Sequence, residues 1–81
     1  MVLSQLKNQD RFRVIKVTLD KEIGKRLVDM GFSQGTEGIV VRSALLGDPL
    51  QINLLSYNVS IRKKEASGIE VELIKEKEDG K

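Results

Sequence analysis

The chain has 81 residues, the length of one small domain, and its lack of cysteine excludes stabilisation by disulfide bonds. It also lacks histidine, so a tight zinc or ferrous iron site within one chain is not expected. The 14 basic and 12 acidic residues leave a net charge of +2, which is too small to indicate a dedicated nucleic-acid-binding protein.

The first elements along the chain are a short helical turn and a strand. Leu3–Leu6 fits a single helical turn that plugs a barrel end, with Ser4 as its cap. Arg11–Val17 is typical of a strand, since apolar and basic residues alternate at its start. Ile15 and Val17 then change the phase of the alternation. The change of phase predicts a strand that bends or is covered on both faces.

A helix is expected over Asp20–Met30, where Asp20 can cap the first turn. Glu22 precedes Arg26 by four residues, the favourable order for a helical ion pair. Gly31 stands where a residue with positive φ can end the helix without a side-chain clash. Helical spacing places three apolar residues on one face: Ile23, Leu27 and Met30.

The second half of the chain is rich in short alternating segments. We expect strands at Thr36–Arg42, Leu50–Leu54, Val59–Ile61 and Ile69–Leu73. Turns are expected at residues 47–49 and 56–58, and a helical turn at residues 62–66. Residues 75–81 contain only charge and glycine, which indicates a charged flexible tail after a single domain of residues 1–74.

These elements predict a mostly-β fold, a small β-barrel with the helix inserted between its first two long strands. Closing a short-stranded sheet on itself removes most of its exposed edges. Ile23 and Leu27 of the helix should cap or flank the core. The alternating residues of the later strands should fill one core: Leu50, Ile52, Leu54, Val59, Ile61, Ile69, Val71 and Leu73.

Several residues have both a structural and a functional interpretation. Gly31, Gly35 and Gly47 are expected to serve backbone geometry, because no glycine-rich loop precedes a helix in the P-loop pattern. Met30 and Phe32 fit core or rim packing. The functional alternative for them is an apolar patch at the helix end that receives a partner.

Two further segments are ambiguous in the same way. Asp48 and Pro49 are typical of a turn, in which Asp48 bonds the local backbone, and the alternative is a loop used for docking. Arg62, Lys63 and Lys64 form the one local basic cluster of the sequence, which by default is solvated surface. Its functional interpretation is contact with an acidic protein surface, with nucleic acid as the less favoured partner.

The sequence indicates neither an enzyme nor a cofactor-binding protein. Without histidine or cysteine, acid-base or nucleophile pairs would need lysine, tyrosine or carboxylates, and no such pair has a suggestive spacing. No acidic loop has the ligand spacing of a calcium site. No apolar stretch approaches the roughly 18 residues of a membrane span, and the N-terminus lacks signal-peptide features. We therefore expect a soluble cytoplasmic protein.

Four motifs follow one another with defined gaps and cover nearly the whole chain up to Ile74. They are Leu3-x-x-Leu6, Arg26-Leu27-x-Asp29-Met30-Gly31-Phe32-x-x-Gly35-Thr36, Gly47-Asp48-Pro49-Leu50, and Tyr57-x-Val59-x-Ile61-Arg62-x-x-Glu65-Ala66-x-x-Ile69. Together they resemble the FeoA family, ferrous iron transport protein A. The chain departs from the family pattern in turns: Gln9-Asp10 and Ser56 stand where glycine is common, and Ala44-Leu45 where alanine-proline is common.

The resemblance implies an SH3-like barrel and a role in transition metal handling, specifically in ferrous iron transport. It also implies a partner, the membrane transporter FeoB with its cytoplasmic G-protein domain. The same fold resembles the C-terminal domain of iron- and manganese-dependent repressors, so fold alone does not settle function. A repressor would need a DNA-binding domain before this one.

We therefore expect a non-enzymatic accessory or regulatory module that docks on the cytoplasmic part of a FeoB-type transporter, without entering the membrane or binding nucleic acid. The alternative is a stand-alone regulatory or nucleic-acid-binding SH3-like barrel. The candidate partner-binding residues are Arg26, Met30, Phe32, Asp48, Leu50 and Arg62.

Overall fold

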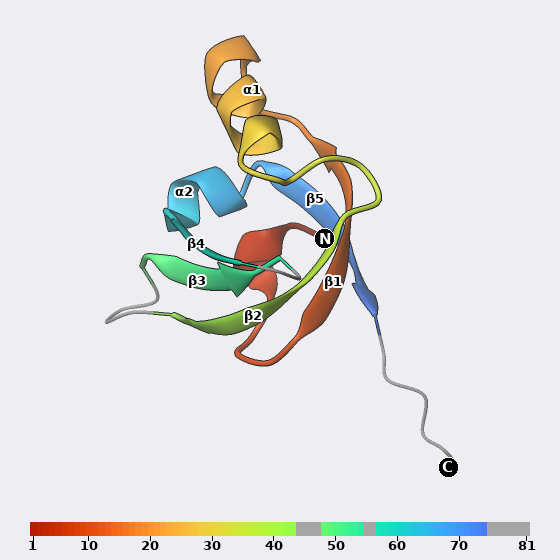
Figure 1. The fold of residues 1–81 in the computed structure, drawn as a ribbon, viewed down its shortest axis with the longest axis vertical. Helices are drawn as coiled ribbons and strands as arrows, with labels where there is room; N and C mark the ends of the chain where they lie inside the picture. Colours follow the sequence, from red (N-terminus) through yellow and green to blue (C-terminus); the bar gives the residue numbers. More distant parts are fainter. Residues whose placement is uncertain (44–47, 55–56, 75–81) are drawn as a thin grey trace.

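The computed structural model describes residues 1–43, 48–54 and 57–74 (Figure 1). Gly47, Ser56, Ala44-Leu45 and the expected tail at residues 75–81 lie outside these ranges. In chain order the elements are the 3₁₀ turn η1 (Leu3–Gln5), β1 (Arg11–Val17), α1 (Lys21–Asp29), β2 (Glu37–Ser43), β3 (Leu50–Asn53), β4 (Asn58–Ile61), α2 (Lys63–Ala66) and β5 (Ile69–Ile74).

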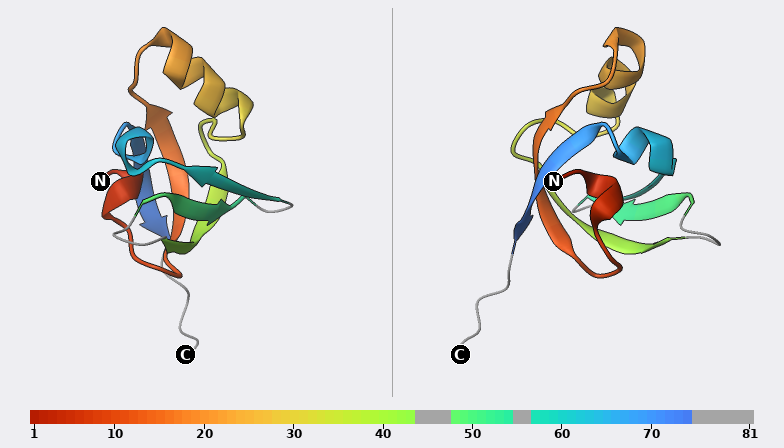
Figure 2. Two further views of the ribbon diagram at one scale, coloured as in Figure 1. Left: turned by 90° about the vertical axis from the view of Figure 1, so that its left-hand side faces the viewer. Right: turned by 180° about the vertical axis from the view of Figure 1, so that it is seen from behind.

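The strands form one antiparallel five-stranded sheet in the order β4-β3-β2-β1-β5, which confirms the predicted mostly-β fold. Figures 1 and 2 show the sheet curling around a common interior, with α1 standing beyond the end of β1 and α2 beside the β4 end. The N-terminus lies along β5, where Val2 bridges Glu70 and the Val71 amide donates to the Met1 carbonyl oxygen at 2.8 Å. This contact covers part of an edge that would otherwise be open.

β1 bends where the sequence changes phase. Its pairing with β5 shifts register between Val14 and Lys16, so Ile15 is the extra residue of a bulge. Phe12 and Val14 are buried before the bulge, and Val17 packs against the core after it. The predicted bend is therefore confirmed.

α1 begins as predicted, because the Asp20 carboxylate accepts a hydrogen bond from the Ile23 amide at 3.1 Å. Leu27 is fully buried and Met30, the C-cap residue, packs against the core. Ile23, however, remains 37% exposed. The first turn of α1 extends past the barrel, so the prediction that Ile23 flanks the core is wrong.

The core contains most of the predicted residues but not Leu73. Leu73 pairs with Phe12 and so has the expected orientation, yet it is 39% exposed. It lies near the end of edge strand β5, while η1 packs on that strand nearer its start. Val59 is partly buried against the core. The buried apolar residues are Leu3, Leu6, Phe12, Val14, Leu27, Phe32, Val40, Leu50, Ile52, Leu54, Ile61, Ala66, Ile69 and Val71.

The N-terminal segment differs in detail from the prediction. The cap of η1 is Val2, whose amide donates to the Gln5 side-chain oxygen at 2.8 Å, and Ser4 lies inside the turn. Gln9, which stands where the family commonly has glycine, has a φ of +76°. Two hydrogen bonds hold it there, from its amide to the Val40 carbonyl at 2.6 Å and from its side chain to the Val41 carbonyl at 3.2 Å.

Replacing Leu27 with alanine should lower the free energy of unfolding by about 2–5 kcal/mol, because the change leaves a cavity in the core. The matched control is Val28→Ala, since Val28 is the next residue of the same helix and is 43% exposed. Urea unfolding followed by circular dichroism measures both variants. Equal losses for the two substitutions would contradict the assigned orientation of α1.

Candidate functional site

The structure separates the six candidate residues into two groups. Phe32 and Leu50 are 0% and 5% exposed, so both belong to the core and cannot supply the surface contact proposed for them. Phe32 turns inward after the helix end, and the alternation of β3 directs Leu50 to the inner face. Of the other four, Met30 is half-buried. The three exposed residues are Arg26, Asp48 and Arg62.

Three of these four residues contact the short helix α2. Arg26 of α1 forms an ion pair with Glu65, and not with Glu22 as the helical spacing predicted. The other carboxylate oxygen of Glu65 accepts from the Arg62 amide at 3.1 Å. Asp48 accepts from the Lys63 amide at 2.9 Å, so it caps α2 instead of bonding its own turn. The two acidic side chains satisfy amides that a helix N-terminus leaves without a partner.

Glu65 is the central residue of this arrangement, and the sequence placed it in a family motif without assigning it a role. It is the third residue of α2, a position from which a glutamate can reach back to the helix start. That spacing was readable from Arg62-x-x-Glu65. The second role of Glu65, as partner of Arg26, joins residues 39 positions apart and depends on the tertiary fold.

The end of α1 is fixed by Tyr57. The Tyr57 hydroxyl donates to the Met30 carbonyl oxygen at 2.5 Å, which satisfies an acceptor at the helix C-terminus. A Cβ on Gly31 would lie 2.3 Å from that hydroxyl, and the φ of Gly31 is +121°. Gly31 is therefore needed for both space and conformation, as its expected backbone role requires. Arg26 also contacts the Met30 sulfur, at 3.6 Å.

On the outer face of the sheet, ion pairs join neighbouring strands. Arg13 of β1 donates to Glu72 of β5 at 2.6 Å and to Glu37 of β2 at 3.1 Å. The hydrogen bonds to Glu72 and Glu37 raise the pKa of the Arg13 guanidinium above its ordinary value. Lys16 and Glu70 form a further pair at 4.0 Å. These contacts neutralise much of the charge on this face.

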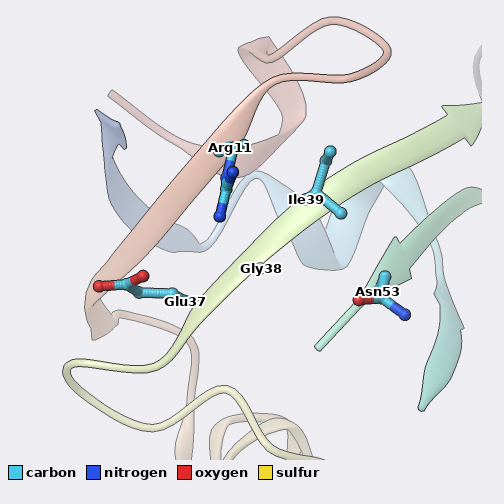
Figure 3. A pocket seen from close by; sticks show the side chains of 5 residues that line it. All are labelled: Arg11, Glu37, Gly38, Ile39 and Asn53. Carbon is cyan, nitrogen blue, oxygen red and sulfur yellow. The ribbon is translucent and has the colours of Figure 1, made fainter. Parts of the chain in front are cut away.

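A hollow of about 100 Å³ lies over the first three strands of the sheet (Figure 3). Ligand pockets usually enclose about 300–1,000 Å³, so this hollow is small for a metabolite. Its lining residues are Arg11, Glu37, Gly38, Ile39 and Asn53.

Within the described ranges, no three acidic side chains are grouped in a way that could hold a metal ion. Neither of the helices found there is long and apolar enough to span a membrane.

A family model described as the FeoA domain matches residues 1–73 of the chain. The Fe(2+) transport protein A/Fe(2+) transporter FeoB fusion protein of Porphyromonas gingivalis (strain ATCC BAA-308 / W83) is 40% identical over 74 residues. The matched segment is 91% of this chain and 9% of that protein, so the chain spans less than a tenth of the fusion protein.

Two solved structures support the same relationship. FeoA from Chlorobium tepidum, determined by NMR, is 37% identical with a TM-score of 0.87, covering 96% of this chain and 74% of that one. The crystal structure of Stenotrophomonas maltophilia FeoA, a zinc complex described as a prokaryotic SH3 domain protein, is 28% identical with a TM-score of 0.78 and covers 89% of each chain.

Replacing Asp48 with alanine should cost about 0.5–2 kcal/mol of stability, because it removes the acceptor for an amide at the start of α2. Asp48→Asn is the matched control, since its side-chain oxygen can still accept that bond. Thermal and urea unfolding compare the two variants. Unchanged stability in Asp48→Ala would show that the cap contributes nothing.

The protein should bind ferrous iron and zinc only weakly, because its sequence offers carboxylates but no imidazole or thiolate ligand. Isothermal titration calorimetry on tag-free protein, under anaerobic conditions for iron, tests this. A stoichiometric site tighter than about 1 μM would overturn the expectation.

Proposed function

This chain belongs to the FeoA family, and we propose that it is a non-enzymatic accessory module of ferrous iron transport that docks on the cytoplasmic part of a FeoB-type transporter. The observation that carries the proposal is the fusion protein of P. gingivalis, in which an FeoA part and FeoB share one chain. A covalent link holds two domains at a high effective concentration, which is useful where they act together. A separate module must reach the same partner by its own affinity.

The use of the charged residues supports a binding role over a catalytic one. Arg26 and Glu65 join the two helices, Asp48 caps α2, and Arg13 cross-links strands. These groups are already engaged in contacts within the chain. An accessory module of this kind acts by preferring one state of its partner, and the binding free energy then shifts the partner toward that state.

The surface proposed for docking is the side of the molecule that carries α2 and the end of α1. Arg26, Met30, Asp48 and Arg62 are the candidate residues that remain accessible there, three of them exposed and one half-buried. Positive charge at Arg62, Lys63 and Lys64 would steer association with an acidic surface. Because such steering acts through solvent, salt should weaken the encounter.

The second candidate function, nucleic-acid binding, has one observation in its favour. The cluster Arg62, Lys63 and Lys64 lies on one short exposed segment. Single-strand binding usually adds aromatic side chains on which bases stack. Tyr57 is 46% exposed, but its hydroxyl is bonded to the end of α1. Phe12 and Phe32 are fully buried, so the described surface favours a protein partner.

We expect the protein to bind the intact transporter with micromolar affinity that falls as salt rises, and to bind random DNA poorly. Biolayer interferometry with the intact transporter in detergent, its soluble G-protein domain and a random duplex measures the three affinities. Arg62→Glu should weaken transporter binding, because it reverses an exposed charge. Lys7→Glu is the control, since it makes a comparable charge change at an exposed residue outside α1, α2 and the Arg62, Lys63 and Lys64 cluster.

The results separate the alternatives. Binding to the intact transporter but not to its G-protein domain would move the docking site to another cytoplasmic segment. Failure to bind either, together with sub-micromolar binding to DNA at physiological salt, would favour the nucleic-acid-binding function.

A further inference from the structure

A groove of about 290 Å³ lies between α1 and α2, and one of its sides is apolar while the other is charged. Leu19 and Ile23 supply an apolar side, and the residues from α2 and its N-cap supply charge. The lining residues are Leu19, Ile23, Arg62, Lys64 and Glu65.

The apolar side of the groove is held in place by close packing. Leu19 lies so near Gly68 that a Cβ on Gly68 would be 2.3 Å from the Leu19 Cγ atom. Glycine at position 68 therefore lets Leu19 settle against the barrel. Ile23, one turn into α1, is 37% exposed beside it. An apolar surface of this kind gains stability when a partner side chain covers it.

The charged side of the groove has an excess of positive charge. Glu65, the one acidic residue of the lining, is neutralised by its ion pair with Arg26. The side chains of Arg62 and Lys64 have no hydrogen bond or ion pair within residues 1–43, 48–54 and 57–74. The groove therefore presents, next to its apolar side, two cations that have no counterion among the described residues.

Several cations elsewhere on the described surface have acidic partners, although Lys7, Lys21, Arg42 and Lys63 have no ion pair there either. Arg13 bridges two glutamates on the sheet, Lys16 lies 4.0 Å from Glu70, and Lys25 pairs with Asp29 at 3.6 Å on α1. A partner that approached those positions would have to compete with an existing contact. Arg62 and Lys64 are available without breaking one, and they stand beside exposed apolar surface.

We propose that the groove between α1 and α2 binds an acidic amphipathic peptide segment, with an apolar side chain against Leu19 and Ile23 and carboxylates at Arg62 and Lys64. The identification of this segment as part of a FeoB-type transporter rests on the proposed function, whereas the chemistry of the groove does not. The chain's own residues 75–81 carry carboxylates but no apolar side chain, so they match half of these requirements.

Two synthetic peptides and the cytoplasmic region of the transporter are the probes for this proposal. One peptide carries two leucines flanked by glutamates, and the other has lysines in place of the glutamates. NMR titration of isotope-labelled protein should show shift changes at Leu19, Ile23 and Lys64 with the acidic peptide alone. The acidic peptide should also displace the transporter region in a competition assay.

Two groove variants and one matched control test the residues. Lys64→Glu and Ile23→Ser should each weaken both the acidic peptide and the transporter region by about tenfold. Lys7→Glu makes the same charge change outside both the groove lining and the Arg62, Lys63 and Lys64 cluster, and should cost less than about threefold. Unfolding curves of all variants establish that they fold.

Each outcome decides between this proposal and the one on which it partly rests. Wild-type binding to the transporter that Lys64→Glu and Ile23→Ser leave unchanged would overturn the groove and keep the proposed function. Peptide binding that these variants abolish, with no binding to the transporter, would keep the groove and overturn the proposed function. Equal affinity for both peptides, or a groove whose variants alter self-association alone, would overturn the proposed acidic partner.

Discussion

β1 pairs with β2 through Arg11 to Arg13 and with β5 through its whole length, so one strand holds together the two halves of the sheet. It can do so because the register shift between Val14 and Lys16 bends it. A bulge of this kind bends the strand and increases its twist, which helps the sheet curl around a single core. The course of β1 determines where α1 begins, because α1 follows this strand in the chain. It also determines where β2 lies, because β2 pairs with the first residues of β1.

The two helices are attached to this barrel in different ways. α1 is anchored by the burial of Leu27 and by the Tyr57 hydroxyl at its C-terminal end. α2 has four residues, too few for a stable isolated helix, and its start is satisfied by Asp48 and Glu65. Exposed ion pairs usually contribute little to stability, so the link between Arg26 and Glu65 is better understood as setting the spacing of the helices than as holding the fold.

The spacing of α1 and α2 sets the geometry of the groove that we propose as a docking site. Membership of the FeoA family connects the domain to ferrous iron transport, but the family fold does not by itself specify the chemistry of a docking surface. The chemistry proposed for it here comes from Leu19 and Ile23 on one side of the groove and, on the other, from Arg62 and Lys64, which have no ion pair among the described residues. On such a surface, burial of apolar side chains supplies the affinity, and the charged groups orient the partner.

The sequence alone determined the elements whose signals are local. Asp20 predicted the start of α1, and the phase change at Ile15 predicted the bend in β1. The alternation of β3 correctly placed Ile52 in the core. These patterns are local because hydrogen bonding and side-chain direction repeat within a few residues. The ordered motifs extended the prediction to the family, since their gaps reflect one arrangement of elements.

The tertiary structure alone decided which of the candidate residues reach the surface and what they contact. Phe32 and Leu50 are core residues, Asp48 caps a helix fifteen residues away, and Leu73 is exposed despite its inward register. Arg26 forms its ion pair with Glu65 and not with Glu22, the partner that helical spacing predicted. No local pattern could show this contact. Burial and long-range pairing depend on how the bent sheet brings distant segments together, and that information is absent from any short stretch of sequence.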